Sequence, residues 1–201
     1  MSDRRSRLAL FGILTLAVVV FDQATKAVVD SSFGLSSPSS FAPDAEIVAP
    51  TPILGDFLRV AKTYNSGAIF GLFDSGALLF AVGSIVVAAG IAWYTITRGW
   101  RGPLLLVVAL GLLMGSALGN LIDRLRFAYV IDFADMGIGS LRWYSFNVAD
   151  ASLSVALVLL VGLALFGGLL VESREGAEDP PSGAGAAPGE SGSSGAPGES
   201  G

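Results

Sequence analysis

Hydrophobic residues of this chain are gathered into four long runs that charged residues rarely interrupt. The runs cover residues 8–29, 77–96, 103–122 and 151–171, approximately. Each is close to the roughly 20 apolar residues that a helix needs to cross the hydrocarbon core of a bilayer. The pattern therefore predicts an α-helical integral membrane protein with a bundle of four transmembrane helices.

The composition agrees with a membrane protein, because 52% of the 201 residues are apolar and only 14% are charged. Soluble domains carry about 25% charged residues. The first run could also be a cleavable signal peptide, since Arg4, Arg5 and Arg7 precede it. A retained first helix is favoured because Asp22 and Lys26 lie inside this run and three further runs follow.

The basic residues beside the runs predict the orientation of the helices. Three arginines lie in residues 1–7, and Arg98 and Arg101 lie in the short link between the second and third runs. Short loops rich in lysine and arginine stay in the cytoplasm. We therefore expect both termini to be cytoplasmic, with residues 30–76 and 123–150 on the outer side.

The outer segment 30–76 is too long for a simple turn. Residues 31–52 are rich in serine and proline and are typical of a loop. This loop is long and has the character of an insert. Apolar and aromatic residues within 56–73 predict one or two short strands, interrupted between Asn65 and Gly67. The segment therefore predicts a small extracytoplasmic β-rich lobe.

The composition changes sharply after residue 171. Residues 172–201 are mostly glycine, serine, alanine, proline and glutamate, and such a segment cannot bury a hydrophobic core. We expect a disordered cytoplasmic tail that follows a four-span domain covering 8–171.

The chain contains neither cysteine nor histidine. Disulfides, cysteine nucleophiles, cysteine-based zinc sites and histidine triads are therefore excluded. Hydrolytic chemistry would have to use carboxylates, lysine, serine or backbone groups. The sequence has no phosphate-binding loop and no basic patch for nucleic acid, so we expect no cofactor, no metal and no nucleic-acid partner.

Polar residues in or beside the runs are candidates for function, because charged groups in a membrane are costly. The predicted topology places all of them at the outer membrane face. They are Asp22 and Lys26 in the first run, Asn65 in the lobe, Asn120, Asp123 and Arg124 at the end of the third run, Asp132 after it, and Asn147 and Asp150 where the fourth begins. Their convergence predicts one polar site.

A glycine stripe supports the same site. Gly111, Gly115 and Gly119 recur every four residues, a spacing that lets membrane helices approach closely. Asp123 continues this stripe, so we expect it to face the interior of the bundle. Alternatively, the glycines only pack helices and the polar residues only mark the membrane interface.

Two local pairs have structural interpretations as well. Asp22 and Lys26 are four residues apart, a spacing that suits an ion pair along a helix, and such a pair could simply hold the first helix in place. Asn147 and Asp150 resemble a capping box, in which Asp150 would only satisfy a helix end. The positive end of a helix also favours an ionised carboxylate there.

Five sequence blocks together resemble the successive signatures of the lipoprotein signal peptidases, also called type II signal peptidases. In order they are Phe-Asp22-Gln-Ala-Thr-Lys26, Tyr-Asn65-Ser-Gly67-Ala-Ile-Phe70, Gly119-Asn120-Leu-Ile-Asp123-Arg124, Val-Ile-Asp132-Phe and Phe-Asn147-Val-Ala-Asp150. The resemblance covers about residues 8–171. It implies a four-helix bundle with an outer β-cradle and a short extracytoplasmic helix between the third and fourth spans.

The resemblance also implies a bacterial membrane aspartyl endopeptidase. Such an enzyme removes signal peptides from diacylglyceryl-modified prolipoproteins by cleaving before the lipidated cysteine. Its substrates and the membrane lipids would be its partners, with no obligatory protein partner. Asp132 and Asp150 match the catalytic pair. Residues that match positions around the substrate or the pair are Asn65, Asn120, Arg124 and Asn147, and supporting positions are Asp22, Lys26, Asp123 and Gly119.

Two carboxylates that share a proton can hydrolyse an amide bond without metal, cysteine or histidine. We hypothesise that Asp150, at a helix terminus, is the ionised member and that Asp132 holds the proton. A peptidase using Ser66 with Lys62 or Lys26 is less favoured, because nothing in the sequence indicates that Lys62 is desolvated. A small transporter or channel, or a purely structural membrane subunit, is a further alternative, but all the acids lie at one membrane face.

Overall fold

The computed structural model describes residues 2–67 and 76–178. The chain forms two compact units, of which the first ends at Leu165 and the second begins at Phe166. The described part of the second unit is the C-terminal portion of a helix that ends at Glu178. The first unit carries all the predicted site residues.

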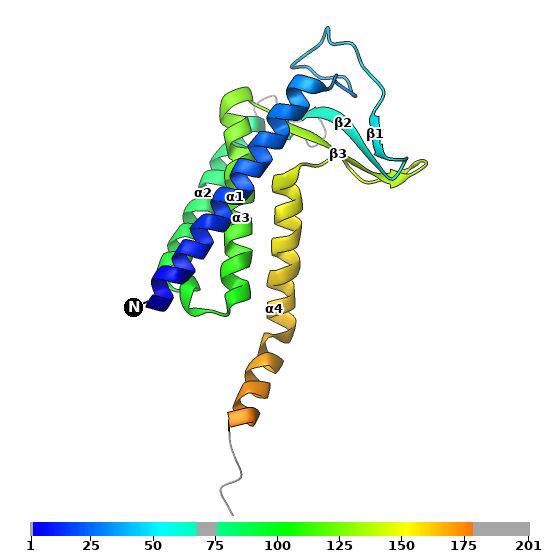
Figure 1. Ribbon diagram of the computed structural model, residues 1–201. Coiled ribbons are helices and arrows are strands. Elements are labelled where there is room, and N and C mark those ends of the chain that lie inside the picture. The colour runs from blue at the N-terminus through cyan, green and yellow to red at the C-terminus, as the bar shows by residue number, and fades with distance from the viewer. Residues whose placement is uncertain (1, 68–75, 179–201) are drawn as a thin grey trace, which may run out of the picture. The chain divides into compact units, whose positions relative to one another are not determined.

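Four long helices dominate the structure (Figure 1). They are α1 (Ser2–Ser32), α2 (Gly76–Thr97), α3 (Leu104–Phe127) and α4 (Val148–Glu178), and a short 3₁₀ turn, Gly99–Arg101, joins α2 to α3. Each helix contains an apolar stretch long enough to cross a membrane. The four predicted membrane helices are confirmed. A disordered tail was expected from residue 172, but α4 continues to Glu178. The remainder of that expected tail, residues 179–201, lies outside the described residues.

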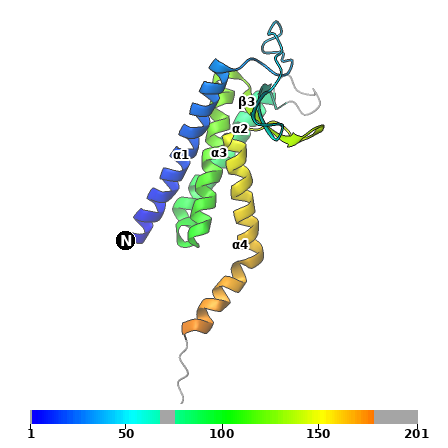
Figure 2. The same cartoon turned by 45° about the vertical axis from the view of Figure 1, so that its right-hand side comes forward.

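A small antiparallel sheet lies at the end of the helices remote from the N-terminus of α1 (Figures 1 and 2). Its strands are β1 (Thr51–Leu54), β2 (Leu58–Asn65), β3 (Val130–Ile138) and β4 (Leu141–Arg142), in the order β1-β2-β3-β4. The predicted β-rich lobe is therefore confirmed, and β2 lies where a strand was expected. Part of the predicted strand segment, residues 68–75, lies outside the described residues.

The short helix expected between the third and fourth spans is absent, and β3 and β4 occupy the segment between α3 and α4. This expectation was wrong for a physical reason. Ala128, in the left-handed conformation with φ 64°, ends α3 and donates its N–H to the carbonyl of Arg124. The chain then pairs with β2 from Val130 onward, so its backbone hydrogen bonds are satisfied by the sheet instead of by a helix.

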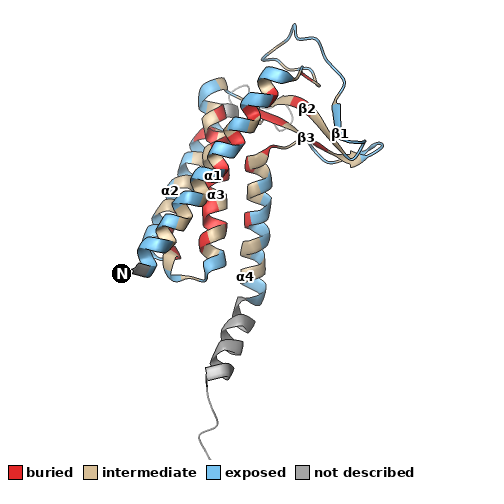
Figure 3. Ribbon diagram, viewed as in Figure 1, coloured by how far each residue is buried: buried red, intermediate tan, exposed pale blue. Residues whose placement is uncertain are grey.

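Helix α3 lies at the centre of the packing, because both α1 and α2 pack against it. Most of the buried residues in the helices lie on α3 (Figure 3). Ile91 of α2 and Leu110 and Met114 of α3 form an apolar core. The outward surfaces of the helices remain apolar, as expected for surfaces that face lipid.

The glycine stripe of α3 faces α1. A Cβ atom added at Gly115 would lie 2.6 Å from the Cβ of Val18, and one at Gly111 would lie 3.0 Å from the Cβ of Leu14. Neither distance leaves room for a side chain. The prediction that these glycines allow a close helix contact is therefore confirmed.

Ion pairs hold the lobe together. Asp135 of β3 accepts hydrogen bonds from the Nε atoms of Arg59 at 2.9 Å and Arg142 at 2.8 Å. Burial opposes ionisation of Asp135, but these two guanidinium groups outweigh burial and hold its pKa below the usual value. Asp135 thus ties β2 and β4 to β3 through charged hydrogen bonds.

We predict that Gly115→Ala lowers the free energy of unfolding by about 1–3 kcal/mol, because the new methyl group forces α1 away from α3. Reversible unfolding in mixed micelles would measure the effect. Gly90→Ala in α2 is a matched control, since no atom lies within 4 Å of its added Cβ. Equal stability of the Gly115 and Gly90 variants would contradict the close contact.

Candidate active site

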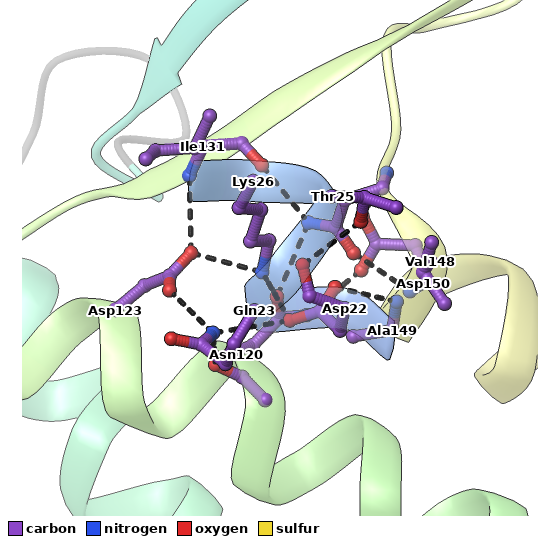
Figure 4. Close-up of polar contacts among 12 residues, drawn as sticks. Asp22, Gln23, Thr25, Lys26, Asn120, Asp123, Ile131, Val148, Ala149 and Asp150 are labelled. Carbon is purple, nitrogen blue, oxygen red and sulfur yellow. Dashed lines mark hydrogen bonds and ion pairs between the residues drawn. The ribbon is translucent and has the colours of Figure 1, made fainter. Parts of the chain in front are cut away.

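A buried ion cluster connects α1 with α3. The Nζ atom of Lys26 lies 2.8 Å from Oδ2 of Asp22 and 2.9 Å from Oδ2 of Asp123 (Figure 4). It also donates a hydrogen bond of 3.1 Å to Oδ1 of Asn120. All three charged side chains are 2% exposed or less, so the lysine charge is neutralised inside the protein. The predicted pairing of Asp22 with Lys26 is present.

The two acids of this cluster extend it to the neighbouring elements. Oδ1 of Asp22 accepts a 2.9 Å hydrogen bond from the backbone N–H of Ala149, in the first turn of α4. Oδ2 of Asp123 accepts one of 3.2 Å from the backbone N–H of Ile131, in β3. The cluster therefore fixes the start of α4 and the start of β3, which carry the two candidate catalytic acids.

Two asparagines connect the ion cluster to Asp132 and Asp150. Asn120 accepts from Lys26 and donates through Nδ2 to Oδ1 of Asp150 at 2.9 Å. Asn147 donates through Nδ2 to Oδ1 of Asp132 at 2.7 Å and to Oδ1 of Asn120 at 3.2 Å. The two acids thus belong to a single hydrogen-bonded network, although β3 supplies one and α4 the other.

Asp132 is almost completely buried, with 1% of its surface exposed. Its other oxygen, Oδ2, accepts a 2.9 Å hydrogen bond from Nδ2 of Asn65, at the end of β2. Burial raises the pKa of Asp132 to about 7, and the negative charge of Asp150 acts in the same direction. Hydrogen bonds from Asn65 and Asn147, and the charge of Lys26, oppose this rise. Protonated Asp132 is therefore substantially populated near neutral pH.

Asp150 occupies a more open position. Its backbone N–H donates to Oδ1 of Asn147 at 3.0 Å, and its Oδ2 accepts from the backbone N–H of Asn147 at 3.3 Å. This reciprocal pair is the predicted capping box at the start of α4. Asp150 is partly exposed and lines a cavity, so it is more accessible to water than Asp132 is.

This cavity, of about 760 Å³, lies between the lobe and the first turns of α4. Its walls are mostly apolar and include Phe57, Met136, Ile138, Leu141, Trp143 and Phe146. Cavities of this size and character suit ligands with hydrophobic groups. The polar network and the apolar cavity therefore meet at Asp150.

Arg124 and Gly119 lie beside the network. Arg124 donates to the backbone carbonyl of Asn120 at 3.3 Å, and its guanidinium lies 5.4 Å from the ring centroid of Phe80. Its buried Nε has no hydrogen-bond partner among the described residues. A Cβ at Gly119 would lie 2.7 Å from Oδ2 of Asp22, so glycine is needed for this acid to approach α3.

Gln23 also belongs to this network, although no role was predicted for it. Its Nε2 lies within hydrogen-bond distance of Asp22, the carbonyl of Gly119 and Asp123, the last at 2.8 Å. Its position between two candidate residues on a membrane helix was the available signal. Among the described residues, no three acidic side chains lie close enough together to hold a metal ion.

The alternative pairing of Ser66 with a lysine receives no support from the geometry. Contrary to the sequence-based expectation, Lys62 is buried. Its Nζ nevertheless donates to the backbone oxygen of Asp30 at 3.0 Å and lies 3.3 Å from the Asp30 carboxylate. An ammonium group held in this way is a poor general base. Lys26 is held equally firmly within its own cluster.

Known proteins resemble this chain along most of its length. The profile of the signal peptidase (SPase) II family matches residues 14–166. The lipoprotein signal peptidase of Sphingopyxis alaskensis is 38% identical over 90% of this chain and 99% of its own length. That of Syntrophus aciditrophicus is 34% identical over 77% of this chain and 91% of its own length.

Solved structures resemble it too. A bacterial membrane enzyme structure obtained by the in meso method at 1.9 Å resolution superimposes with a TM-score of 0.64 and 27% identity, over 76% of this chain and 90% of that one. A second such structure gives a TM-score of 0.61 at 25% identity, over 84% and 92% of the two chains. None of these similarities supports a transporter. The chain is therefore a multi-pass bacterial membrane protein of the signal peptidase II family, the aspartyl proteases that act on prolipoproteins.

Proposed function

We propose that Asp132 and Asp150 are the catalytic pair with which this protein cleaves diacylglyceryl-modified prolipoproteins before the lipidated cysteine. The observation that carries the proposal is the shared network: Asn147 and Asn120 connect the carboxyl group of Asp132 with that of Asp150, and Asp150 lines the apolar cavity. Two acids in such different surroundings can divide the roles of acid and base.

Asp132 is the proton-holding member in this proposal. It is buried, and its pKa is raised to about 7, chiefly by burial and also by the charge of Asp150. Asp150 lies in the first turn of α4, where the positive end of the helix favours a carboxylate. The resting pair then contains one proton, on Asp132.

The reaction follows from this arrangement. The Asp150 carboxylate takes a proton from water as the water oxygen attacks the carbonyl carbon of the scissile bond. Asp132 gives its proton to the carbonyl oxygen as the tetrahedral intermediate forms. The proton on Asp150 then passes to the leaving nitrogen as the C–N bond breaks, and Asp132 recovers its proton from the intermediate's hydroxyl group. The pair thereby returns to its resting protonation state, and the proton taken from water remains on the leaving amine.

The surroundings of the pair suit a lipid-modified peptide. Arg124 lies beside the network, and a guanidinium group of this kind can hold a carbonyl or head-group oxygen. The apolar walls of the cavity provide a surface for the hydrophobic parts of the substrate. Because the acyl chains of such a substrate stay in the bilayer, it can reach the site by lateral diffusion, with no obligatory protein partner.

The arginines near the start of α1 and in the α2–α3 link support a cytoplasmic location for that end of the bundle. With four membrane crossings, both termini lie in the bacterial cytoplasm in this proposal. The lobe lies at the opposite end of α1 and α3 (Figure 1). In this proposal that end, with β3 and the start of α4 that carry the acid pair, is at the extracytoplasmic face of the plasma membrane.

We predict that Asp132→Asn and Asp150→Asn each reduce cleavage at least about 1,000-fold, because each removes one half of the acid–base pair. Purified protein in detergent, with a diacylglyceryl prolipoprotein as substrate, would measure this. Asp44→Asn, at an exposed position, is the control. Full activity of either catalytic variant would contradict the proposal.

The pH dependence should reveal the raised pKa of Asp132. Its protonated form is present below about pH 7 and is lost as the pH rises through that value. The basic limb of the pH profile, where kcat/KM falls as the pH rises, should therefore lie near pH 7. Asn65→Ala removes a hydrogen bond that favours the ionised form, and should move this limb to higher pH by about one unit. A limb that moves to lower pH would contradict the assignment.

A water-soluble peptide with the same cleavage sequence but no lipid should be a poor substrate. We expect kcat/KM to be lower by roughly 100-fold or more, because the acyl chains concentrate the substrate in the membrane. Parallel assays of the lipidated and unlipidated peptides in the same detergent would measure the ratio. Equal rates would exclude recognition of the lipid.

A further inference from the structure

Strand β2 presents its last residues to opposite sides of the sheet. Lys62 and Tyr64 both reach Asp30, near the C-terminal end of α1. Asn65 points the other way and reaches Asp132. This is the alternation expected of a strand. Strand β2, whose Asn65 contacts the candidate catalytic acid, is therefore held on its other side by α1.

The contacts with Asp30 are short and partly buried. The hydroxyl of Tyr64 donates to Oδ1 of Asp30 at 2.9 Å. The Nζ of Lys62 donates to the backbone oxygen of Asp30 at 3.0 Å and lies 3.3 Å from Oδ1. The lysine thus satisfies a carbonyl in the last turn of α1, where the helix leaves such groups without partners.

Aromatic packing limits the movement of Tyr64. Its ring stacks on that of Tyr129 with centroids 4.2 Å apart, and Tyr129 also contacts Phe41 at 4.8 Å. Burial and the adjacent Asp30 raise the pKa of Tyr64 above its usual range. The hydroxyl therefore remains protonated and remains a donor to Asp30.

A β-bulge in β2 includes Lys62 itself and lies immediately before the last three residues of the strand. Val60 pairs with Ala134 and Thr63 with Asp132, so two residues of β2 face one residue of β3 between them. Bulges bend a strand and turn its side chains, and they are frequent beside active sites. Beyond the bulge, the last residues of β2 pair with β3 again, up to Asn65 opposite Val130. The contacts of Lys62 and Tyr64 with Asp30, which we call the anchor, hold the same short segment from its other side.

We propose that Asp30 is a positioning residue for catalysis. By accepting hydrogen bonds from Lys62 and Tyr64 on one face of β2, it keeps the Asn65 amide in contact with the Asp132 carboxyl on the other face. This inference rests on the proposed roles of Asp132 and Asp150. Asp30 acts through the strand and belongs to neither the acid pair nor the cavity lined by Asp150.

Titratable and charged groups from several elements surround both Asp132 and Asp30. Asp132 faces Asp150 of α4, Lys26 of α1 and Arg124 of α3. Asp30 faces Lys62 and Tyr64 of β2, Tyr129, and Arg126 of α3, which lines the same small pocket as Asp30. Of these groups, only Lys62 and Tyr64 belong to the strand that also carries Asn65.

The test compares conservative substitutions in the anchor with a matched control substitution. Tyr64→Phe removes one hydroxyl and keeps the ring that stacks on Tyr129. Asp30→Asn removes the charge that pairs with Lys62 and keeps the carbonyl oxygen. Tyr144→Phe, at an exposed position of the lobe, makes the same chemical change away from the anchor. Thermal unfolding of each purified variant establishes that it is folded.

The measurement is the pH profile of kcat and KM with a lipidated prolipoprotein substrate. We expect Tyr64→Phe and Asp30→Asn to lower kcat roughly tenfold with little change in KM, because the acid is misplaced. The basic limb should move to higher pH by up to about one unit, since the hydrogen bond from Asn65 weakens. Tyr144→Phe should leave kcat, KM and the limb unchanged.

A double variant separates positioning from general destabilisation. In the Asn65→Ala protein, the hydrogen bond to Asp132 is already gone, so adding Tyr64→Phe should not move the basic limb further. A further shift of similar size would overturn the proposal. So would wild-type kinetics in both anchor variants, or a loss of activity with the limb unmoved, which indicates only weaker packing.

The outcome also distinguishes this inference from the catalytic assignment. If the wild-type protein lacks a basic limb near pH 7, or if Asp132→Asn is active, the role of Asp132 is wrong and the positioning role falls with it. If Asp132→Asn is inactive and the wild-type limb is present, an unmoved limb in Tyr64→Phe overturns the positioning role of Asp30 alone.

Discussion

The structure depends on the charge of Lys26, which is buried within a membrane helix and 2% exposed. An isolated ammonium group is costly in such a place, so it must meet acids and hydrogen-bond acceptors. Asp22 and Asp123 provide two carboxylates, and Asn120 provides an amide oxygen. Asp22 lies on the same helix as Lys26, whereas Asp123 and Asn120 lie on α3, so these last two contacts hold α3 against α1 at a fixed height.

The same requirement organises the elements that bear the catalytic candidates. Two acids face one lysine, and their excess negative charge is met by backbone N–H groups of Ala149 and Ile131. These groups belong to the first turn of α4 and to β3. The glycine stripe of α3 makes the arrangement possible, because any larger residue at Gly119 would displace the carboxylate of Asp22.

The two acids beyond this cluster have the same chemistry and different surroundings. Asp132 is enclosed on a strand and receives hydrogen bonds from Asn65 and Asn147. Asp150 lies in a helical first turn and borders the cavity. Burial favours the neutral form of Asp132 and raises its pKa. The asymmetry that acid–base chemistry needs therefore arises from two kinds of secondary structure meeting at one point.

The sequence by itself determined the features that depend on neighbours along the chain. Four apolar runs predicted four membrane helices, because the thickness of a bilayer sets the length of a helix that crosses it. The four-residue spacing from Gly111 to Asp123 correctly indicated one helix face, and Asn147 with Asp150 correctly indicated a capping box. All of these follow from the geometry of a single helix.

Only the tertiary structure decided the rest. Strands β3 and β4 replaced an expected helix, because the partner of β3 is β2, which lies far away in the sequence. The hydrogen bonds from Asn65 to Asp132 and from Lys62 to Asp30 likewise join residues that are distant along the chain. The burial of Asp132 also depends on such distant residues. Local sequence patterns do not encode such contacts, since they exist only when separate elements pack together and exclude water.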